Sequence, residues 1–142
     1  MPSATLDTNI YISALVYGGI PLRLLHLAID GDLDVAISRP ILDETLRILR
    51  EKFGWSGERL QDAETLIDKF ARRVSPSQTL NVITEDEPDN RILECAAEAG
   101  SEYIVSGDKD LHRLGQYGNS RVIKVSDMLG LIQSVGWRSP GR

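Results

Sequence analysis

The 142-residue sequence has a single cysteine, no long hydrophobic run and no excess of positive charge. A lone cysteine, Cys95, excludes an internal disulfide and fits a reducing cytoplasm, and its simplest interpretation is a small buried side chain. No apolar stretch approaches the roughly 20 residues that span a bilayer. The first four residues, from Met1 to Ala4, show neither the basic nor the apolar region of a signal peptide. We therefore expect a cytoplasmic protein without a membrane segment.

The shortage of basic residues bears directly on nucleic-acid binding. Lys and Arg number 16 against 21 Asp and Glu, a net charge of −5, whereas nucleic-acid binders usually carry a basic footprint. The objection weakens if several acids bind divalent cations, because bound cations invert the local charge. Taken singly, each basic residue is more simply part of a solvated face. The candidates for phosphate contact are Arg47, Arg50, Arg91, Lys109 and Arg113.

Several catalytic motifs are also missing. The sequence has no G-x-G-x-x-G or Walker A loop, no G-x-S-x-G elbow and no Cys/His spacing for zinc. His26 stands without a second His or Cys at ligand spacing, so we interpret it as a packing or surface residue. A phosphatase with an aspartyl nucleophile would usually carry D-x-D after the first strand, where this chain has Asn9 at the second position.

What the sequence does have is a regular alternation of strand and helix patterns in a chain of single-domain length. Strands are predicted up to Asp7 and at residues 33–38, 103–106 and 121–125, with a weak candidate at 79–83. Helices are predicted at residues 9–16, 21–30, 40–53, 58–74, about 90–99, 111–114 and 128–135. Arg72 and Arg73 would then suit the negative end of the 58–74 helix. This order predicts an α/β fold, a three-layer α/β/α sandwich on a mainly parallel sheet, formed by residues 1–136 with a tail at 137–142.

Acidic residues recur where strands end and helices begin. Asp7 follows the first strand and Asp108 follows a later apolar strand, the edge at which open α/β sheets place their ligands. Glu44 falls at the rim of the apolar face of the 40–53 helix, and Asp89 falls at or next to the start of the following helix. Four acids in comparable places predict one site.

Three of these acids also have a simpler explanation. Asp7 and Asp89 can be helix caps, and a first-turn Glu44 complements the helix dipole. Asp110 either assists Asp108 or caps the 111–114 helix. If the four acids do converge, they cannot all ionise without a neutralising cation. Hard cations such as Mg²⁺ or Mn²⁺ prefer oxygen ligands and support phosphodiester hydrolysis.

Four segments together resemble PIN-domain ribonucleases, and most closely the branch of toxin components of prokaryotic toxin–antitoxin systems. They are Leu6-Asp7-Thr8-Asn9, Glu44, Pro88-Asp89-Asn90 leading into Ile92-Leu93-Glu94-Cys95-Ala96, and Val105-Ser106-Gly107-Asp108-Lys109-Asp110-Leu111. The resemblance covers nearly the whole chain. It implies a metal-dependent endoribonuclease acting on single-stranded RNA, held by an antitoxin protein. Its implied ligands are Asp7, Glu44, Asp89 and Asp108, with Asn9 and Ser106 holding nearby groups.

Two positions depart from the family pattern. Ser106 stands where many relatives carry Thr, which keeps the hydroxyl. Pro88 stands where close relatives often have another Asp, which leaves Asp86 and Glu87 as acids farther from the metal.

A second reading stays open: a catalytically weak or inactive PIN-fold module that binds RNA or protein. The complete set of four acids favours the enzyme, because a scaffold does not need clustered negative charge. We also expect a homodimer, since the helices at 21–30 and 40–53 carry more apolar surface than one small sheet face needs and similar domains pair through their helices.

Overall fold

The computed structural model describes residues 1–80, 82 and 87–136. Its strands are β1 Ser3–Leu6, β2 Asp34–Ser38, β3 Ala71–Val74, β4 Tyr103–Val105, β5 Gln116–Tyr117 and β6 Ser120–Ile123. Its helices are α1 Thr8–Tyr17, α2 Gly19–Ile29, α3 Arg39–Phe53, α4 Gly57–Phe70, α5 Glu87–Ala99, α6 Lys109–Leu114 and α7 Val125–Gly136. The predicted tail at 137–142 lies outside the described residues.

The strands form one sheet in the order β3-β2-β1-β4-β6-β5. Every neighbouring pair is parallel except β5 and β6. The predicted α/β fold with a mainly parallel sheet is therefore confirmed. The chain runs from β1 to β2 on one side of β1 and later returns to β4 on the other, so the strand order reverses between β1 and β4. In open α/β sheets, ligands bind beyond the carboxyl ends of the strands at such a point.

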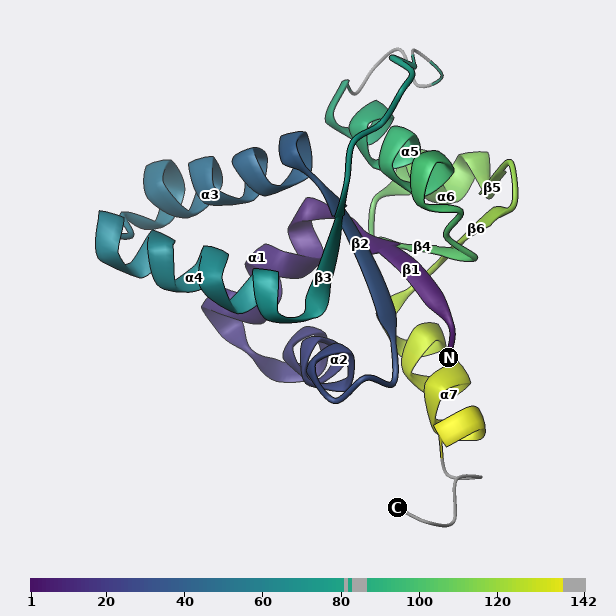
Figure 1. Cartoon of the computed structure of the whole chain (residues 1–142), viewed down its shortest axis with the longest axis horizontal. Coiled ribbons are helices and arrows are strands. Elements are labelled where there is room, and N and C mark those ends of the chain that lie inside the picture. The colour runs from purple at the N-terminus through teal and green to yellow at the C-terminus, as the bar shows by residue number, and fades with distance from the viewer. Residues whose placement is uncertain (81, 83–86, 137–142) are drawn as a thin grey trace.

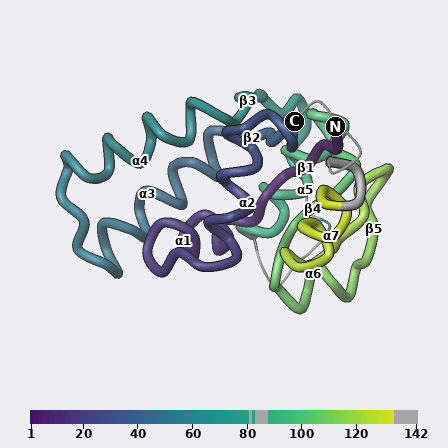
Figure 2. Tube along the Cα trace, turned by 90° about the horizontal axis from the view of Figure 1, so that it is seen from below, coloured from purple at the N-terminus to yellow at the C-terminus, as the bar shows by residue number. Residues whose placement is uncertain are grey.

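Helices cover both faces of this sheet (Figure 1). Helix α5 packs against β1, β2, β3 and β4 on one face. On the other face α2 contacts α1 and α7, and these three helices lie in front of the sheet when the molecule is viewed from below (Figure 2). Helices α3 and α4 contact each other and extend away from the sheet edge (Figure 1).

The core forms because the strands and the amphipathic helices bury their apolar faces together. Leu6 of β1, Ile41 of α3 and Leu93 of α5 are among its fully covered side chains. A second cluster of Ile12, Leu49 and Ala63 joins α1, α3 and α4. Burial of each large aliphatic side chain contributes about 1.5–3 kcal/mol, so this shared core holds the helices against the sheet.

Cys95 is a buried core residue, as predicted. Its Sγ accepts a hydrogen bond from the Thr5 hydroxyl at 3.7 Å. Burial disfavours the charged thiolate and raises the pKa of the Cys95 thiol to about 11, although the Thr5 hydrogen bond opposes the rise.

The predicted helix at 58–74 is wrong in its last turn. Helix α4 ends at Phe70, and Ala71–Val74 form β3, paired in parallel with β2. Arg72 and Arg73 therefore serve no helix end: Arg72 pairs with Asp34 at 3.4 Å, and Arg73 pairs with two acids of α4. Four residues are too few for periodicity to separate a last helical turn from a strand, so pairing with β2 decides.

The weak strand candidate at 79–83 is not a strand in its described part, and Asn81 and Ile83 lie outside the described residues. The backbone N–H of Leu80 donates to Oε2 of Glu94 at 2.7 Å, and that of Val82 donates to Oδ1 of Asn90 at 2.9 Å. Side chains of α5 thus take the place of a neighbouring strand. The short β5 was not predicted.

Within the described part of the chain, no single helix is long and apolar enough to cross a membrane. Helices α1 and α2 have the length and composition only as a pair, and the chain bends by 104° between them.

Candidate metal centre and adjoining pocket

Asp7 lies directly after β1 at the carboxyl edge of the sheet and is 5% exposed. Its Oδ1 accepts the backbone N–H of Asn9 at 3.5 Å, which caps α1, and its Oδ2 accepts the Ser106 hydroxyl at 2.6 Å. A buried carboxylate requires such donors because it has lost its hydration. Oδ1 of Asp7 therefore caps α1, while Oδ2 points to the loop that follows the neighbouring strand β4. Asn9 takes part through its backbone, and its side chain is exposed.

Ser106 is fully buried and joins the ends of two neighbouring strands. Its hydroxyl donates to Asp7 after β1 and accepts the backbone N–H of Asp108 after β4, at 2.9 Å. One hydroxyl thus sets the position of the Asp7 carboxylate relative to the loop that carries Asp108.

Asp108 is the N-cap of α6. Its Oδ1 accepts the backbone N–H of Asp110 at 2.7 Å and of Leu111 at 3.3 Å. The alternative in which Asp110 caps this helix is therefore wrong. Asp110 lies in the first turn, and its carboxylate pairs with Arg113 at 3.0 Å.

Carboxylates from two helices and a loop converge at this edge. One ligand oxygen from each of Asp89, Asp108 and Asp110 lies within 4.8 Å of the other two. Asp89 belongs to the first turn of α5 and is 4% exposed, but α5 begins at Glu87, so Asp89 is not its N-cap. In the described part of the chain, Asp7 and Glu44 are not members of this group. We call Asp89, Asp108 and Asp110 the acidic cluster.

The acidic cluster has the chemistry of a hard-cation site. Three carboxylates this close repel one another when all are ionised, and a divalent cation removes that repulsion. Oxygen donors from carboxylates are the ligands that Mg²⁺ and Mn²⁺ prefer. The donor set therefore fits the predicted cation.

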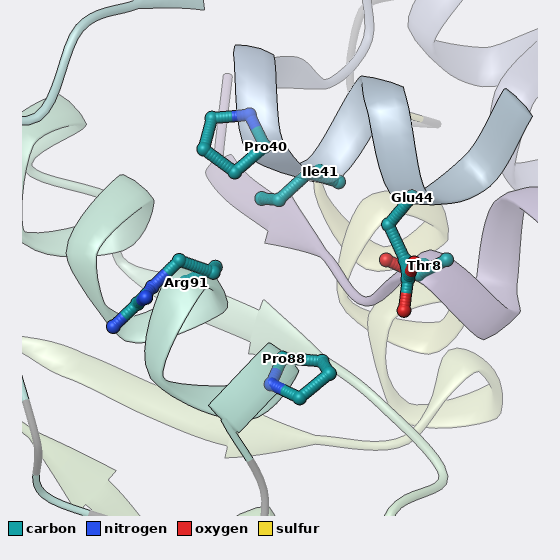
Figure 3. Close-up of a pocket in the computed structure, with 6 residues that line it drawn as sticks. All are labelled: Thr8, Pro40, Ile41, Glu44, Pro88 and Arg91. Atoms are coloured by element: carbon teal, nitrogen blue, oxygen red, sulfur yellow. The ribbon is translucent and has the colours of Figure 1, made fainter. Parts of the chain in front are cut away.

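Glu44 lines a pocket of about 350 Å³, together with Pro88, the residue that precedes Asp89 of the acidic cluster. Arg47 donates to its Oε1 through Nε at 2.9 Å and through a second guanidinium nitrogen. The pocket is lined by residues from the start of three helices: Thr8, Pro40, Ile41, Glu44, Pro88 and Arg91. Figure 3 shows Pro40, Ile41 and Glu44 on α3 facing Pro88 and Arg91 on α5.

The basic residues predicted to contact RNA differ in whether they form ion pairs. Arg47 pairs with Glu44 and Glu51, and Arg91 pairs with Glu94 at 2.9 Å. Arg50 and Arg113 also form ion pairs. Lys109 is exposed and forms no ion pair with the residues the structure describes. Asp86 and the side chain of Glu87, predicted as more distant acids, lie outside the described residues.

Sequence reasoning missed His112 and Thr8. The His112 Nε2 lies 2.5 Å from the Ser106 carbonyl oxygen, and because a carbonyl only accepts, Nε2 carries the proton. The available signal was its position four residues after Asp108, on the same side of α6. Thr8 follows Asp7 and lines the pocket, a role that only the approach of α5 creates.

A family model described as PIN domain matches residues 3–110. A solved structure of VapBC2 from Rickettsia felis, bound to a DNA fragment from their promoter, has a similar fold with a TM-score of 0.64. The two chains share 17% identity over 86% of this chain and 98% of that chain. No curated protein matches the sequence.

Proposed function

Because the chain belongs to the PIN domain family, we propose that it is a metal-dependent endoribonuclease that cleaves single-stranded RNA. The observation that carries this proposal is the acidic cluster, in which the carboxylate of Asp89 meets those of Asp108 and Asp110 from a second segment of the chain. Clustered carboxylates repel one another, so they would only destabilise a structural scaffold. A cation-dependent nuclease needs them, because they bind its metal ion.

In the proposed site, Asp89, Asp108 and Asp110 hold Mg²⁺ or Mn²⁺, with Asp7 beside them and Glu44 at the rim. When bound, the cation supplies positive charge that stabilises the oxygens of the scissile phosphate. Hydrolysis adds water to the phosphorus and breaks one phosphorus–oxygen bond, which leaves a phosphate end and a hydroxyl end. A carboxylate of the site accepts the proton of the attacking water. Ser106 keeps Asp7 in place through its hydroxyl.

Lys109 is the best-supported phosphate contact, since it lies between two members of the acidic cluster in sequence and is exposed without an ion pair in the described part of the chain. Arg47 and Arg91 would have to release their carboxylate partners to reach a phosphate. We therefore expect weak RNA affinity that falls with salt.

Two observations support a toxin of a toxin–antitoxin pair with an antitoxin protein as partner. One is the resemblance of the four sequence segments to that branch, and the other is the fold shared with the VapBC2 structure. We accordingly propose that the protein acts on RNA in the cytoplasm. The partner is tested by searching the neighbouring genes for a small adjacent reading frame, coexpressing its product with this protein and measuring affinity copurification.

A homodimer is also proposed, and exposed apolar side chains support it. Tyr17 is 75% exposed, Ile20 49% and Ile29 44%, and all three lie on α1 or α2. The sequence predicted pairing through the helices at 21–30 and 40–53. Among the described residues α3 has no large exposed apolar side chain, so the proposed dimer surface lies on α1 and α2 instead. Light scattering at high micromolar concentration should give twice the monomer mass; a monomer there contradicts the dimer.

The test of function is cleavage of a fluorescent, unstructured RNA with Mg²⁺, Mn²⁺ or EDTA. We expect cleavage with either metal, none in EDTA, and a loss of orders of magnitude in Asp7→Asn and Asp108→Asn. The matched control is Asp62→Asn, an exposed acid on α4 far from the acidic cluster in sequence. Cleavage in EDTA would refute the mechanism. RNA binding without cleavage would favour the binding module instead.

A further inference from the structure

Helix α6 carries two of the three carboxylates of the acidic cluster, Asp108 as its N-cap and Asp110 in its first turn. It has only six residues. A helix this short is not stable by itself in water, because its first turn fixes several backbone dihedral angles for one hydrogen bond. Contacts with the rest of the protein therefore decide how α6 is oriented. That orientation matters, since a rotation of α6 about its axis would move its carboxylates relative to Asp89 of α5.

Two neighbouring side chains hold α6 from different directions. Leu111 is fully buried and joins the helix to the hydrophobic core. His112 is half-buried, and its ring Nε2 donates to the carbonyl oxygen of Ser106, the residue after β4, at 2.5 Å. Successive residues of an α-helix point about 100° apart, so the two contacts together oppose rotation about the helix axis.

The His112 hydrogen bond ends on a residue that already connects two of the acids. The carbonyl of Ser106 accepts the His112 N–H, and its hydroxyl accepts the backbone N–H of Asp108 at 2.9 Å. The same hydroxyl donates to Asp7 at 2.6 Å. Residues 106–112 therefore form a loop that is tied at both ends, which limits the conformations open to the carboxylates within it.

We propose that His112 is a positioning residue that holds Asp108 and Asp110 at the spacing from Asp89 that a divalent cation requires. This inference rests on the proposed metal-dependent function. His112 is not a member of the acidic cluster, and its Nε2 is bonded to a carbonyl, so it acts through the loop rather than as a ligand. Residues that orient metal ligands in this indirect way typically contribute about 10–100-fold to metal affinity.

Three variants at this position separate the hydrogen bond from the shape of the side chain. His112→Gln keeps an N–H donor at about the reach of Nε2, whereas His112→Asn carries the same amide on a side chain one methylene shorter. His112→Leu has no donor, and because leucine has a higher helix propensity than histidine, a loss in this variant does not come from propensity. His26→Leu is the matched control, the same change at the other histidine, an exposed residue of α2.

The first experiment measures Mn²⁺ affinity by calorimetry, well below the melting temperature of every variant. A loss of global stability alone does not change the affinity there. We expect the dissociation constant for Mn²⁺ to rise about tenfold in His112→Asn and His112→Leu. His112→Gln and His26→Leu should bind Mn²⁺ as the wild type does. If circular dichroism shows that His112→Leu is unfolded, the comparison of the Asn and Gln variants decides.

The second experiment needs neither metal nor RNA. The backbone N–H of Asp108 is bonded to the Ser106 hydroxyl, and that of Asp110 to the Asp108 carboxylate. Hydrogen exchange of these two amides in EDTA should be about tenfold faster in His112→Asn and His112→Leu, because the loop opens more often without its second tie. The wild-type rates should return in His112→Gln. Amides of β1 and β2 serve as internal controls and should not change.

The outcomes distinguish this proposal from the proposed function. Unchanged Mn²⁺ affinity in His112→Asn and His112→Leu refutes the positioning role and leaves the metal-dependent nuclease standing. Absence of Mn²⁺ binding in the wild type refutes the metal-dependent function; the exchange rates then decide whether His112 holds the loop, and equal rates refute it. A Gln variant that binds Mn²⁺ as weakly as the Leu variant also refutes the proposal, because the N–H donor would then not be what His112 supplies.

Discussion

Replacing Ser106 by Ala should destabilise the protein more than the loss of one ordinary hydrogen bond. The Ser106 hydroxyl is fully buried, donates to the Asp7 carboxylate at 2.6 Å and accepts the Asp108 N–H at 2.9 Å. Loss of a hydrogen bond to a charged group costs about 1.5–3 kcal/mol, and a partly buried N–H left without an acceptor costs about 1 kcal/mol more. We therefore expect the free energy of unfolding to fall by about 3 kcal/mol.

Urea unfolding followed by circular dichroism measures this change. With a slope of about 2 kcal/mol per molar urea, the midpoint should fall by about 1.5 M. Ser120→Ala is the matched control, because this buried hydroxyl donates one hydrogen bond, to the Ser101 carbonyl at 2.6 Å, away from the carboxylates. It should cost about 1 kcal/mol. Ser106→Thr keeps the hydroxyl and should stay close to the wild type.

A double-mutant cycle with Asp7→Asn locates the effect. If the Ser106 hydroxyl acts mainly on the charged carboxylate, the cost of Ser106→Ala should shrink clearly in the Asp7→Asn background. A Ser106→Ala cost no larger than that of Ser120→Ala, or an unchanged cost in the double mutant, would refute this account of the strand-end connection.

Other expectations concern the metal, the core thiol and a helix end. Asp108→Asn keeps the cap of α6 but removes one charge of the acidic cluster, so the melting temperature of the metal-free protein should rise. Excess Mn²⁺ should raise the melting temperature of the wild type by very roughly 10 °C, and this increase should disappear in the variant. Unchanged melting temperatures with and without metal would contradict the cluster. Burial raises the pKa of the Cys95 thiol from 9.0 to about 11, so the thiol loses its proton at a higher pH in the native state than in the unfolded chain. The free energy of unfolding should therefore fall by about 2–3 kcal/mol as the pH rises from about 9 to 11. Urea unfolding at pH 8 and 10.5 should show that Cys95→Ala lacks this part of the loss, and equal losses would refute it. Gly54→Ala should cost about 1 kcal/mol because Gly54 ends α3 at φ +67°, while Gly57→Ala, at ordinary φ, should be nearly neutral; equal unfolding midpoints would contradict the strain.

Local patterns were enough to predict most of the elements. The apolar periodicity of α3 and the glycines that end α1 and α5 act over a few residues, so the sequence shows them directly. The same holds for Asp7 and Asp108, each placed by the apolar strand just before it. Where two structures satisfy the same short pattern, as at Ala71–Val74, local information does not decide.

Tertiary structure alone decided which acids meet. Asp7 and Ser106 are 99 residues apart and come together because β1 and β4 are neighbours in the sheet. The fold places Asp110, predicted only as an auxiliary residue, in the acidic cluster and leaves Glu44 in the adjoining pocket. The local sequence does not distinguish Asp110 from Glu44, since both are acids near a helix start. The difference comes from the position of α5, which packs against α3 and brings Asp89 to Asp108 and Asp110, and this position depends on core packing between segments distant in sequence.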